Sequence, residues 1–211
     1  MNAAHRASLA AQLSPQQVMI LDAFQSETYI QNRMDVQHEP LYDTVTLAPG
    51  ATINETSSSL FTNVGPASGK TFAQTNMSQS RRLPAPEAFS IFSIRLRFSE
   101  DILLVDLVAL MNGFAFEFYL GQKCYNRGPV WHYNAGGGIF AYTIAAVPAV
   151  ALYANGVPSR EAQHKLAIPL VIENQMEFYA RLTGTAAALN GGGTGLILVC
   201  LLDGLHARGV Q

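Results

Sequence analysis

The segment of the chain that comes nearest to a chemical motif is Gly-Pro-Ala-Ser-Gly-Lys-Thr at residues 65–71. Two glycines followed by Lys70 and Thr71 are the residue types of a phosphate-binding loop, whose backbone N–H groups surround a phosphate. That loop needs four residues between its glycines, and this chain has three between Gly65 and Gly69. The residues after Thr71 are polar where a phosphate-binding helix should begin. We therefore interpret residues 65–71 as a surface loop.

Metal-binding chemistry is not indicated by the spacing of the candidate ligands. A single helix or strand offers two histidines to a metal when they lie at i, i+2 or i, i+4. No such pair occurs among the five histidines of the chain, which are His5, His38, His132, His164 and His206. Cys124 and Cys200 form no zinc pattern and are expected to be two buried thiols. The sequence therefore predicts no metal site.

Catalytic residues are not grouped in any recognisable pattern either. The chain has no Gly-x-Ser-x-Gly nucleophile elbow. Glu117 and Glu177 are expected on the polar faces of strands, in solvated or cross-strand positions, where their removal would have little effect on stability unless an interface is touched. Cys124 with His132 is more typical of packing than of a nucleophile pair. We expect no enzyme activity, no cofactor and no small-molecule substrate.

Two groups of residues are instead predicted to contact other molecules. Arg81 and Arg82 lie in a polar loop, where paired arginines usually meet carboxylates at a surface or interface. The second group is aromatic and lies near glycines in the sequence. Its members are Trp131, Tyr133, Phe140 and Tyr142. Such aromatics either stack on sugar rings or form protein interfaces, and the low charge of the chain favours interfaces.

The composition points to a protein that buries part of its surface against other chains. Charged residues make up 13% of the 211 residues, against about 25% in an average globular protein. Hydrophobic residues make up 49%, which is ample for a core and argues against disorder. The net charge of −2 does not favour nucleic acid as a partner. The sequence therefore favours an obligate assembly.

No segment resembles a secretory signal or a membrane-spanning helix. Residues 1–13 contain His5 and Arg6 and lack an apolar stretch of the usual length. The two long charge-free stretches, residues 128–159 and 182–202, are interrupted by proline, asparagine or glycine. Export and membrane insertion are not expected.

Strands are predicted where apolar and polar residues alternate. The alternation is clearest in residues 89–98, 114–122 and 175–184, whose apolar faces begin with Phe92, Phe114 and Met176. The whole set amounts to about eight antiparallel strands. The weaker candidates are residues 41–48, 57–64, 139–146, 164–172 and 195–203, of which the last is apolar on both faces.

Two segments have helical rather than strand-like spacing. Residues 99–113 combine an expected cap at Ser99, acidic residues in the first turn and an Asn112-Gly113 stop. Residues 1–40 are rich in alanine and glutamine, and Ser14-Pro15 suits the start of a short helix over residues 16–24. We expect one inserted helix, a partly helical N-terminal arm at 1–40, and a jelly-roll domain at 41–211 that ends in a short tail, 204–211.

This pattern resembles the single jelly-roll coat proteins of icosahedral viruses, particularly the upright-barrel capsid proteins of tailless, membrane-containing phages. The resemblance covers residues 41–203 and is one of architecture, carried by strings such as FSIFSIRLRF at 89–98 and QMEFYARL at 175–182. It implies oligomeric capsomers in a shell, located in the virion. It also implies contacts with copies of the same chain, with other virion proteins and with an internal membrane.

The sequence therefore predicts an all-β antiparallel jelly roll or β-sandwich that serves as a self-assembling structural protein. Its most specific interpretation is a phage capsid subunit. The alternative is a jelly-roll carbohydrate-binding module or appendage protein, which a concave aromatic face with polar neighbours would favour.

Overall fold

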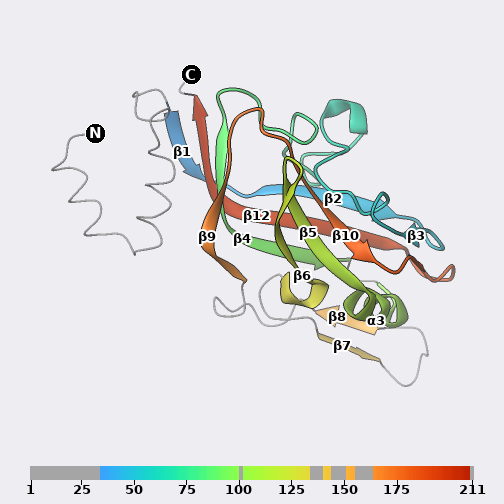
Figure 1. The fold of residues 1–211 in the computed structure, drawn as a ribbon. Coiled ribbons are helices and arrows are strands. Elements are labelled where there is room, and N and C mark those ends of the chain that lie inside the picture. Colours follow the sequence, from blue (N-terminus) through green and yellow to red (C-terminus); the bar gives the residue numbers. More distant parts are fainter. Residues whose placement is uncertain (1–33, 100–101, 134–139, 144–150, 155–163, 210–211) are drawn as a thin grey trace.

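The computed structural model of the chain describes residues 34–99, 102–133, 140–143, 151–154 and 164–209. Over these residues the protein is an antiparallel β-sandwich of the jelly-roll type with one α-helix, which confirms the predicted fold class. A curled five-stranded sheet and a three-stranded sheet face each other across the core (Figure 1).

The larger sheet is built around one long strand, β12 (Leu196–Gly209). β12 pairs with β1 and β2 along one side and with β4 along the other, and β9 forms the edge beyond β4. The bounds of its partners are Met34–His38 for β1, Leu41–Leu47 for β2, Ala88–Phe98 for β4 and Lys165–Ile172 for β9.

The smaller sheet has the order β10-β5-β6, so that β5 is central and β6 is an edge. Two further strand pairs are short, and two single turns of 3₁₀-helix complete the set. The bounds are β5 Phe114–Leu120, β6 Lys123–Pro129, β10 Phe178–Gly184, β3 Thr52–Ile53 with β11 Ala187–Ala188, β7 Phe140–Thr143 with β8 Ala151–Ala154, η1 Pro66–Ser68 and η2 Val130–Tyr133.

The core lies between the two sheets, where the period of two in the sequence places it. In β5 the side chains of Phe114, Phe116, Phe118 and Leu120 are buried, and in β10 those of Phe178, Ala180 and Leu182 are buried. The register pairs Phe116 with Leu182 and Phe118 with Ala180, so the predicted apolar faces of both strands are confirmed.

A β-bulge changes the predicted face of one residue in β4. Phe92 has no partner in the ladders that β4 forms with β12 and β9. The bulge reverses the alternation, so Phe89 and Ile91 face the core on one side of it and Ile94 faces the core on the other. Phe92, predicted to belong to the core face, instead packs with Ala88, Ala207 and Leu205 in a separate cluster.

The bulge also explains a glycine in β12. Opposite the bulge, the register of β12 shifts between Asp203 and Gly204. A Cβ atom on Gly204 would lie 2.0 Å from the backbone oxygen of Ser90 and 2.6 Å from the ring of Phe89. Only glycine allows the two strands to approach this closely.

The predicted inserted helix is α3 (Leu104–Gly113), which ends at the expected glycine. Its start differs from the prediction, because the helix is preceded by Leu103 rather than capped by Ser99. The Ser99 hydroxyl accepts a hydrogen bond from the backbone N–H of Ile197 instead, at 3.2 Å. Asp106 in the first turn is buried and accepts the backbone N–H of Asn190 at 3.0 Å.

Three segments differ from their predictions. Residues 34–38, assigned to the arm, form β1, while residues 1–33 of the arm lie outside the described part. The expected C-terminal tail at 204–211 is the second half of β12 up to Gly209. Residues 57–64 are turns, with Leu60 bridged to Ala180.

No helix in the described part of the chain is long and apolar enough to cross a membrane.

Candidate functional site

The two arginines predicted to contact other molecules behave differently. Arg81 has a left-handed backbone (φ 59°), and its guanidinium lies 3.0 Å from Glu177 and over the ring of Tyr179. The backbone N–H of Arg81 donates a hydrogen bond to the carbonyl of Phe61, and the carbonyl of Arg81 accepts one from the N–H of Phe178. Arg81 therefore also holds its own loop against β10. Arg82 is exposed. Arg82 is therefore the better placed of the two to meet another molecule.

The predicted aromatic group does not form one surface. Trp131 is 57% exposed in η2, whereas Tyr133, two residues later, is 1% exposed and packs on Phe116 with ring centroids 4.7 Å apart. The Tyr133 hydroxyl donates to the amide oxygen of Asn126. Tyr133 is therefore a core residue, not an interface residue. Phe140 and Tyr142 lie in β7, and their side chains are outside the described part.

The loop at 65–71 is a surface loop with a structural role for its lysine. The Lys70 ammonium lies 2.7 Å from the carboxylate of Asp43, which is fully buried at the inner face of β2. The other oxygen of Asp43 accepts the backbone N–H of Phe61 at 2.7 Å. Phe61 is buried with a φ of 61°, a conformation that a bulky residue adopts only when its surroundings fix it. Lys70 is thus the counter-ion of a buried carboxylate.

A polar hollow of about 460 Å³ lies beside this ion pair. Thr44 and Thr46 of β2 line it, and Ser57, Ser59 and Thr62 are among the other residues around it. The Ser59 and Thr62 hydroxyls are bonded to each other at 2.7 Å. The ammonium of Lys70 is already paired with Asp43, so the hollow does not offer it as a free cation for a phosphate.

The outer face of the three-stranded sheet carries a cluster of charged and aromatic side chains that we name the outer-face cluster: Glu117, Tyr119, Arg127 and Arg181. The register places Glu117 of β5 directly between Arg127 of β6 and Arg181 of β10. The Glu117 carboxylate lies 2.6 Å from Arg127 and 3.0 Å from Arg181, and it accepts the Tyr119 hydroxyl at 2.8 Å. Three donors therefore cover Glu117, which is only 2% exposed.

These contacts set the protonation of Glu117. Burial by itself would raise the pKa of this carboxyl. The Tyr119 hydroxyl and the two guanidinium groups lower the pKa by more than burial raises it, so the net pKa lies below the ordinary value. The sequence placed Glu117 on a cross-strand polar face, which is correct. Because this carboxylate is almost completely covered, we now expect its removal to cost more stability than its place on a polar strand face indicates.

Replacement of Glu117 by glutamine is expected to lower the free energy of unfolding by about 2 kcal/mol at neutral pH, because a charged hydrogen-bond acceptor of two arginines is lost. A carboxyl with a lowered folded-state pKa stabilises the protein above its unfolded pKa and loses this effect as pH falls through the folded value. The deficit of Glu117→Gln should therefore shrink in acid. Urea melts at several pH values measure it.

Glu177→Gln is the matched control, since Glu177 is 46% exposed in its side chain and has one ion pair with Arg81. Its expected effect is below about 1 kcal/mol. Equal losses in the two variants at neutral pH would show that the outer-face cluster does not hold Glu117 more firmly than a surface pair.

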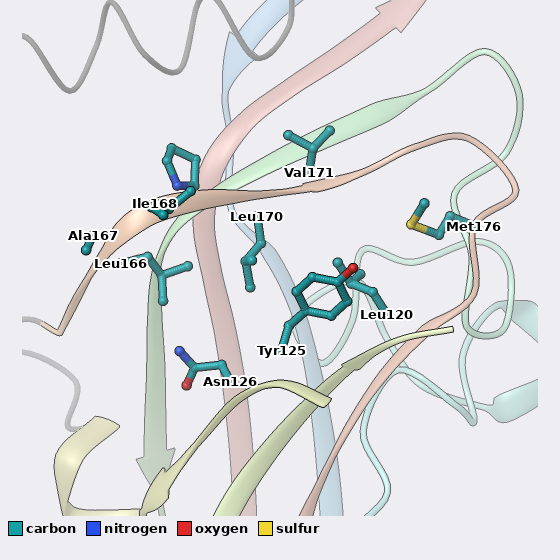
Figure 2. Close-up of a pocket in the computed structure, with 10 residues that line it drawn as sticks. Leu120, Tyr125, Asn126, Leu166, Ala167, Ile168, Leu170, Val171 and Met176 are labelled. Atoms are coloured by element: carbon teal, nitrogen blue, oxygen red, sulfur yellow. The ribbon is translucent and has the colours of Figure 1, made fainter. Parts of the chain in front are cut away.

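An apolar groove lies where the two sheets fail to meet. Its volume is about 560 Å³, and it separates β6, an edge of the smaller sheet, from β9, an edge of the larger one. Figure 2 shows Leu166, Leu170 and Tyr125 directed into the same space, with Met176 and Leu120 toward one end. Ile168 on β9 is 73% exposed and Tyr125 on β6 is 48% exposed. We call this feature the inter-sheet groove.

Two histidines that are distant in the sequence lie in contact. The rings of His132 and His164 have centroids 4.1 Å apart. Burial and the proximity of His132 lower the pKa of His164. Within the described residues, no group of three or more histidine, cysteine, aspartate or glutamate side chains is arranged to hold a metal ion. Of the two thiols predicted to be buried, Cys200 is buried, which raises the pKa of its thiol, whereas Cys124 is only partly covered.

The sequence did not identify the inter-sheet groove, the Asp43–Lys70 pair or the partners of Glu117. The groove depends on which strands lie at the edges of the two sheets, and no pattern in the sequence predicts that. The Asp43–Lys70 pair joins a strand to a loop 27 positions later. Only the partners of Glu117 had a usable signal, because Arg181 lies opposite Glu117 once the two best-predicted strands are paired in register.

Comparison of the chain with protein-family models, with curated proteins and with solved structures finds no match.

Proposed function

We propose that this chain is a self-assembling structural subunit and, in the most specific form of the proposal, a capsid protein of a tailless icosahedral virus. The observation that carries it is the number of large apolar side chains exposed on a chain with 13% charged residues. They lie on several different elements and are Val36, Phe72, Val105, Val108, Tyr125, Trp131, Ile168 and Ile197. Scattered exposed apolar residues are common on monomeric proteins. On this chain, however, few charged side chains are present to oppose association with other chains.

One part of this surface suits a contact between subunits. Val105 and Val108 lie three residues apart on α3 and are 58% and 48% exposed, and α3 contacts η2, which carries Trp131. Both elements lie at the same end of the sandwich (Figure 1). We name Val105, Val108 and Trp131 the α3–η2 patch. Exposed tryptophan and aliphatic side chains of this kind are enriched at interfaces between proteins.

The carbohydrate-binding alternative receives less support from the described residues. It requires exposed aromatic rings together on a concave face. Tyr133 is in the core, Trp131 lies on η2, and Tyr125 lies at the inter-sheet groove. Tyr119 and Tyr179 stack on each other in parallel at 4.8 Å. No observation on this part of the chain favours sugar binding over assembly.

The full-length chain is expected to be an oligomer that buries well over about 1,000 Å² per pair of subunits. The double variant Val105→Asp/Trp131→Asp should shift it to smaller species while changing thermal stability little, because both side chains are more than half exposed. Light scattering and negative-stain microscopy measure assembly, and a thermal melt measures folding.

The matched control is Val105→Ile/Trp131→Phe, which keeps the α3–η2 patch apolar and should assemble normally. A single monomeric species at tens of micromolar, soluble and unchanged by dilution, would contradict the assembly proposal as a whole. Normal assembly of the aspartate variant would reject only the α3–η2 patch as the contact.

A further inference from the structure

We propose that His132 and His164 together form a binding site for a divalent transition-metal ion that prefers imidazole ligands, such as Zn²⁺. The proposal does not rest on the proposed function. The two histidines come from different elements, since His132 lies in η2 and His164 directly precedes β9. A spacing pattern within one helix or strand therefore could not indicate this pair. Their rings are in contact, with centroids 4.1 Å apart.

The separation of the two rings suits one shared ion. Zinc binds an imidazole nitrogen at about 2.0–2.1 Å, so two such nitrogens on a tetrahedral ion lie about 3.3 Å apart. Imidazole rings with centroids 4.1 Å apart and planes inclined at 52° can reach this nitrogen separation by rotation of the side chains. His132 is exposed and His164 is half-buried, so an ion can approach the pair from solvent.

The ring nitrogens of the pair are not used by the fold. No described residue forms a hydrogen bond or an ion pair with the imidazole of His132 or His164. His206 differs, because its ring lies 3.2 Å from the carboxylate of Glu87. Burial and the proximity of His132 lower the pKa of His164. At neutral pH the His164 ring is therefore in the neutral form that binds a metal.

The core holds the two histidines in position. Tyr133, next to His132, is 1% exposed and packs on Phe116. The carbonyl of His164 accepts the hydroxyl of Ser93 at 2.9 Å. The ring of Tyr133 lies 5.3 Å from each imidazole, measured between centroids, and so contacts both rings. A pair that is already assembled loses little conformational entropy when it binds an ion.

Two imidazole ligands determine the class of ion. Imidazole suits Zn²⁺, Cu²⁺ and Ni²⁺, whereas Mg²⁺ and Ca²⁺ require oxygen ligands. The described residues place no third histidine, cysteine or carboxylate in such a group. Within this part of the chain, the other positions on the ion are therefore left to water. A bound ion joins η2 to the start of β9.

Titration of the full-length chain with zinc chloride at neutral pH, followed by calorimetry, tests the proposal. Loss of a group that only orients a metal ligand costs about 10–100-fold in affinity, so His132→Ala and His164→Ala should each weaken binding at least about tenfold. His38→Ala is the matched control, because His38 is exposed and its ring contacts Phe92 rather than another histidine. This control should bind Zn²⁺ as the wild type does.

Two further measurements identify the ligands. Zn²⁺ should raise the midpoint of thermal unfolding in the wild type but not in His132→Ala or His164→Ala, since an ion that binds only the folded state stabilises it. Nitrogen NMR spectra should show zinc-dependent shifts of ring nitrogens in both His132 and His164.

Three results would overturn the proposal: a wild-type Kd for Zn²⁺ weaker than about 1 mM, equal affinity in the wild type and both alanine variants, or an equal loss in His38→Ala. A thermal melt without zinc separates loss of the site from loss of the fold. His132 is exposed, so His132→Ala should melt as the wild type does in that experiment.

Discussion

Phe178→Asp is expected to abolish cooperative folding. Phe178 is fully buried, and its ring packs against Phe61 at 5.4 Å and Phe118 at 6.3 Å between centroids. The substitution removes a large apolar side chain, worth about 3–5 kcal/mol, and leaves a carboxylate in the core, which costs several kcal/mol more. The sum is comparable to the roughly 5–15 kcal/mol that stabilises a whole domain. Circular dichroism and a thermal melt measure the outcome.

The matched control makes the same substitution where the phenylalanine is exposed. Phe72 is 73% exposed, and Phe72→Asp should retain a cooperative melt close to that of the wild type. A soluble, cooperatively melting Phe178→Asp protein would mean that the outward and inward faces of β10 are exchanged. The sandwich described above would then be incorrect.

Lys70→Ala is expected to destabilise the protein by about 3 kcal/mol at neutral pH, since removal of one partner leaves the other charge buried and unpaired. The interpretation of residues 65–71 as a surface loop did not include this role of Lys70, which follows from the complete burial of its partner Asp43. Burial raises the pKa of Asp43 above its ordinary value, although Lys70 and the N–H groups of Phe61 and Thr44 lower it. Without Lys70 this pKa rises further.

The pH dependence has a definite sign. A carboxyl whose folded-state pKa exceeds its unfolded value makes stability fall as pH rises between the two values. The loss in Lys70→Ala should therefore be largest at neutral pH and become smaller as the pH is lowered toward the unfolded pKa of the carboxyl, because protonation removes the unpaired charge of Asp43. In an Asp43→Asn background, Lys70→Ala should cost below about 1 kcal/mol. Denaturant melts that give the same loss at both pH values and in both backgrounds would exclude this account.

The sequence predicts most of the strands whose one face is buried and whose other face is polar. β5 and β10 are of this kind, and their faces follow directly from alternation. The pattern fails where geometry interrupts it, as at Phe92, where one extra residue in β4 moves the side chain to the other face. It also fails for β6. Exposed and partly covered residues alternate along this strand in the structure, but apolar and polar residue types do not alternate in its sequence.

The candidate contact residues were less predictable than the fold. Trp131 and Tyr133 belong to the same aromatic group in the sequence, yet one is exposed and the other is in the core. η2 places them on different sides of a single turn, and residue type alone cannot tell which side faces the core. Similarly, Glu117 and Glu177 occupy equivalent polar positions in the sequence, but only Glu117 has an arginine on both neighbouring strands.

The position of β12 in the chain has a consequence for biosynthesis. β1 and β2 come from the first described residues, and β12, which follows every other strand in sequence, is their partner in the larger sheet. A ribosome that has released residues 34–190 has therefore produced strands whose hydrogen-bonding partner does not yet exist. Pairing between segments so far apart in the chain is slow to form, and nascent strands in this state are exposed to aggregation. The larger sheet must therefore be completed after translation of β12, and until then the exposed edges of β1, β2 and β4 are natural targets for chaperones.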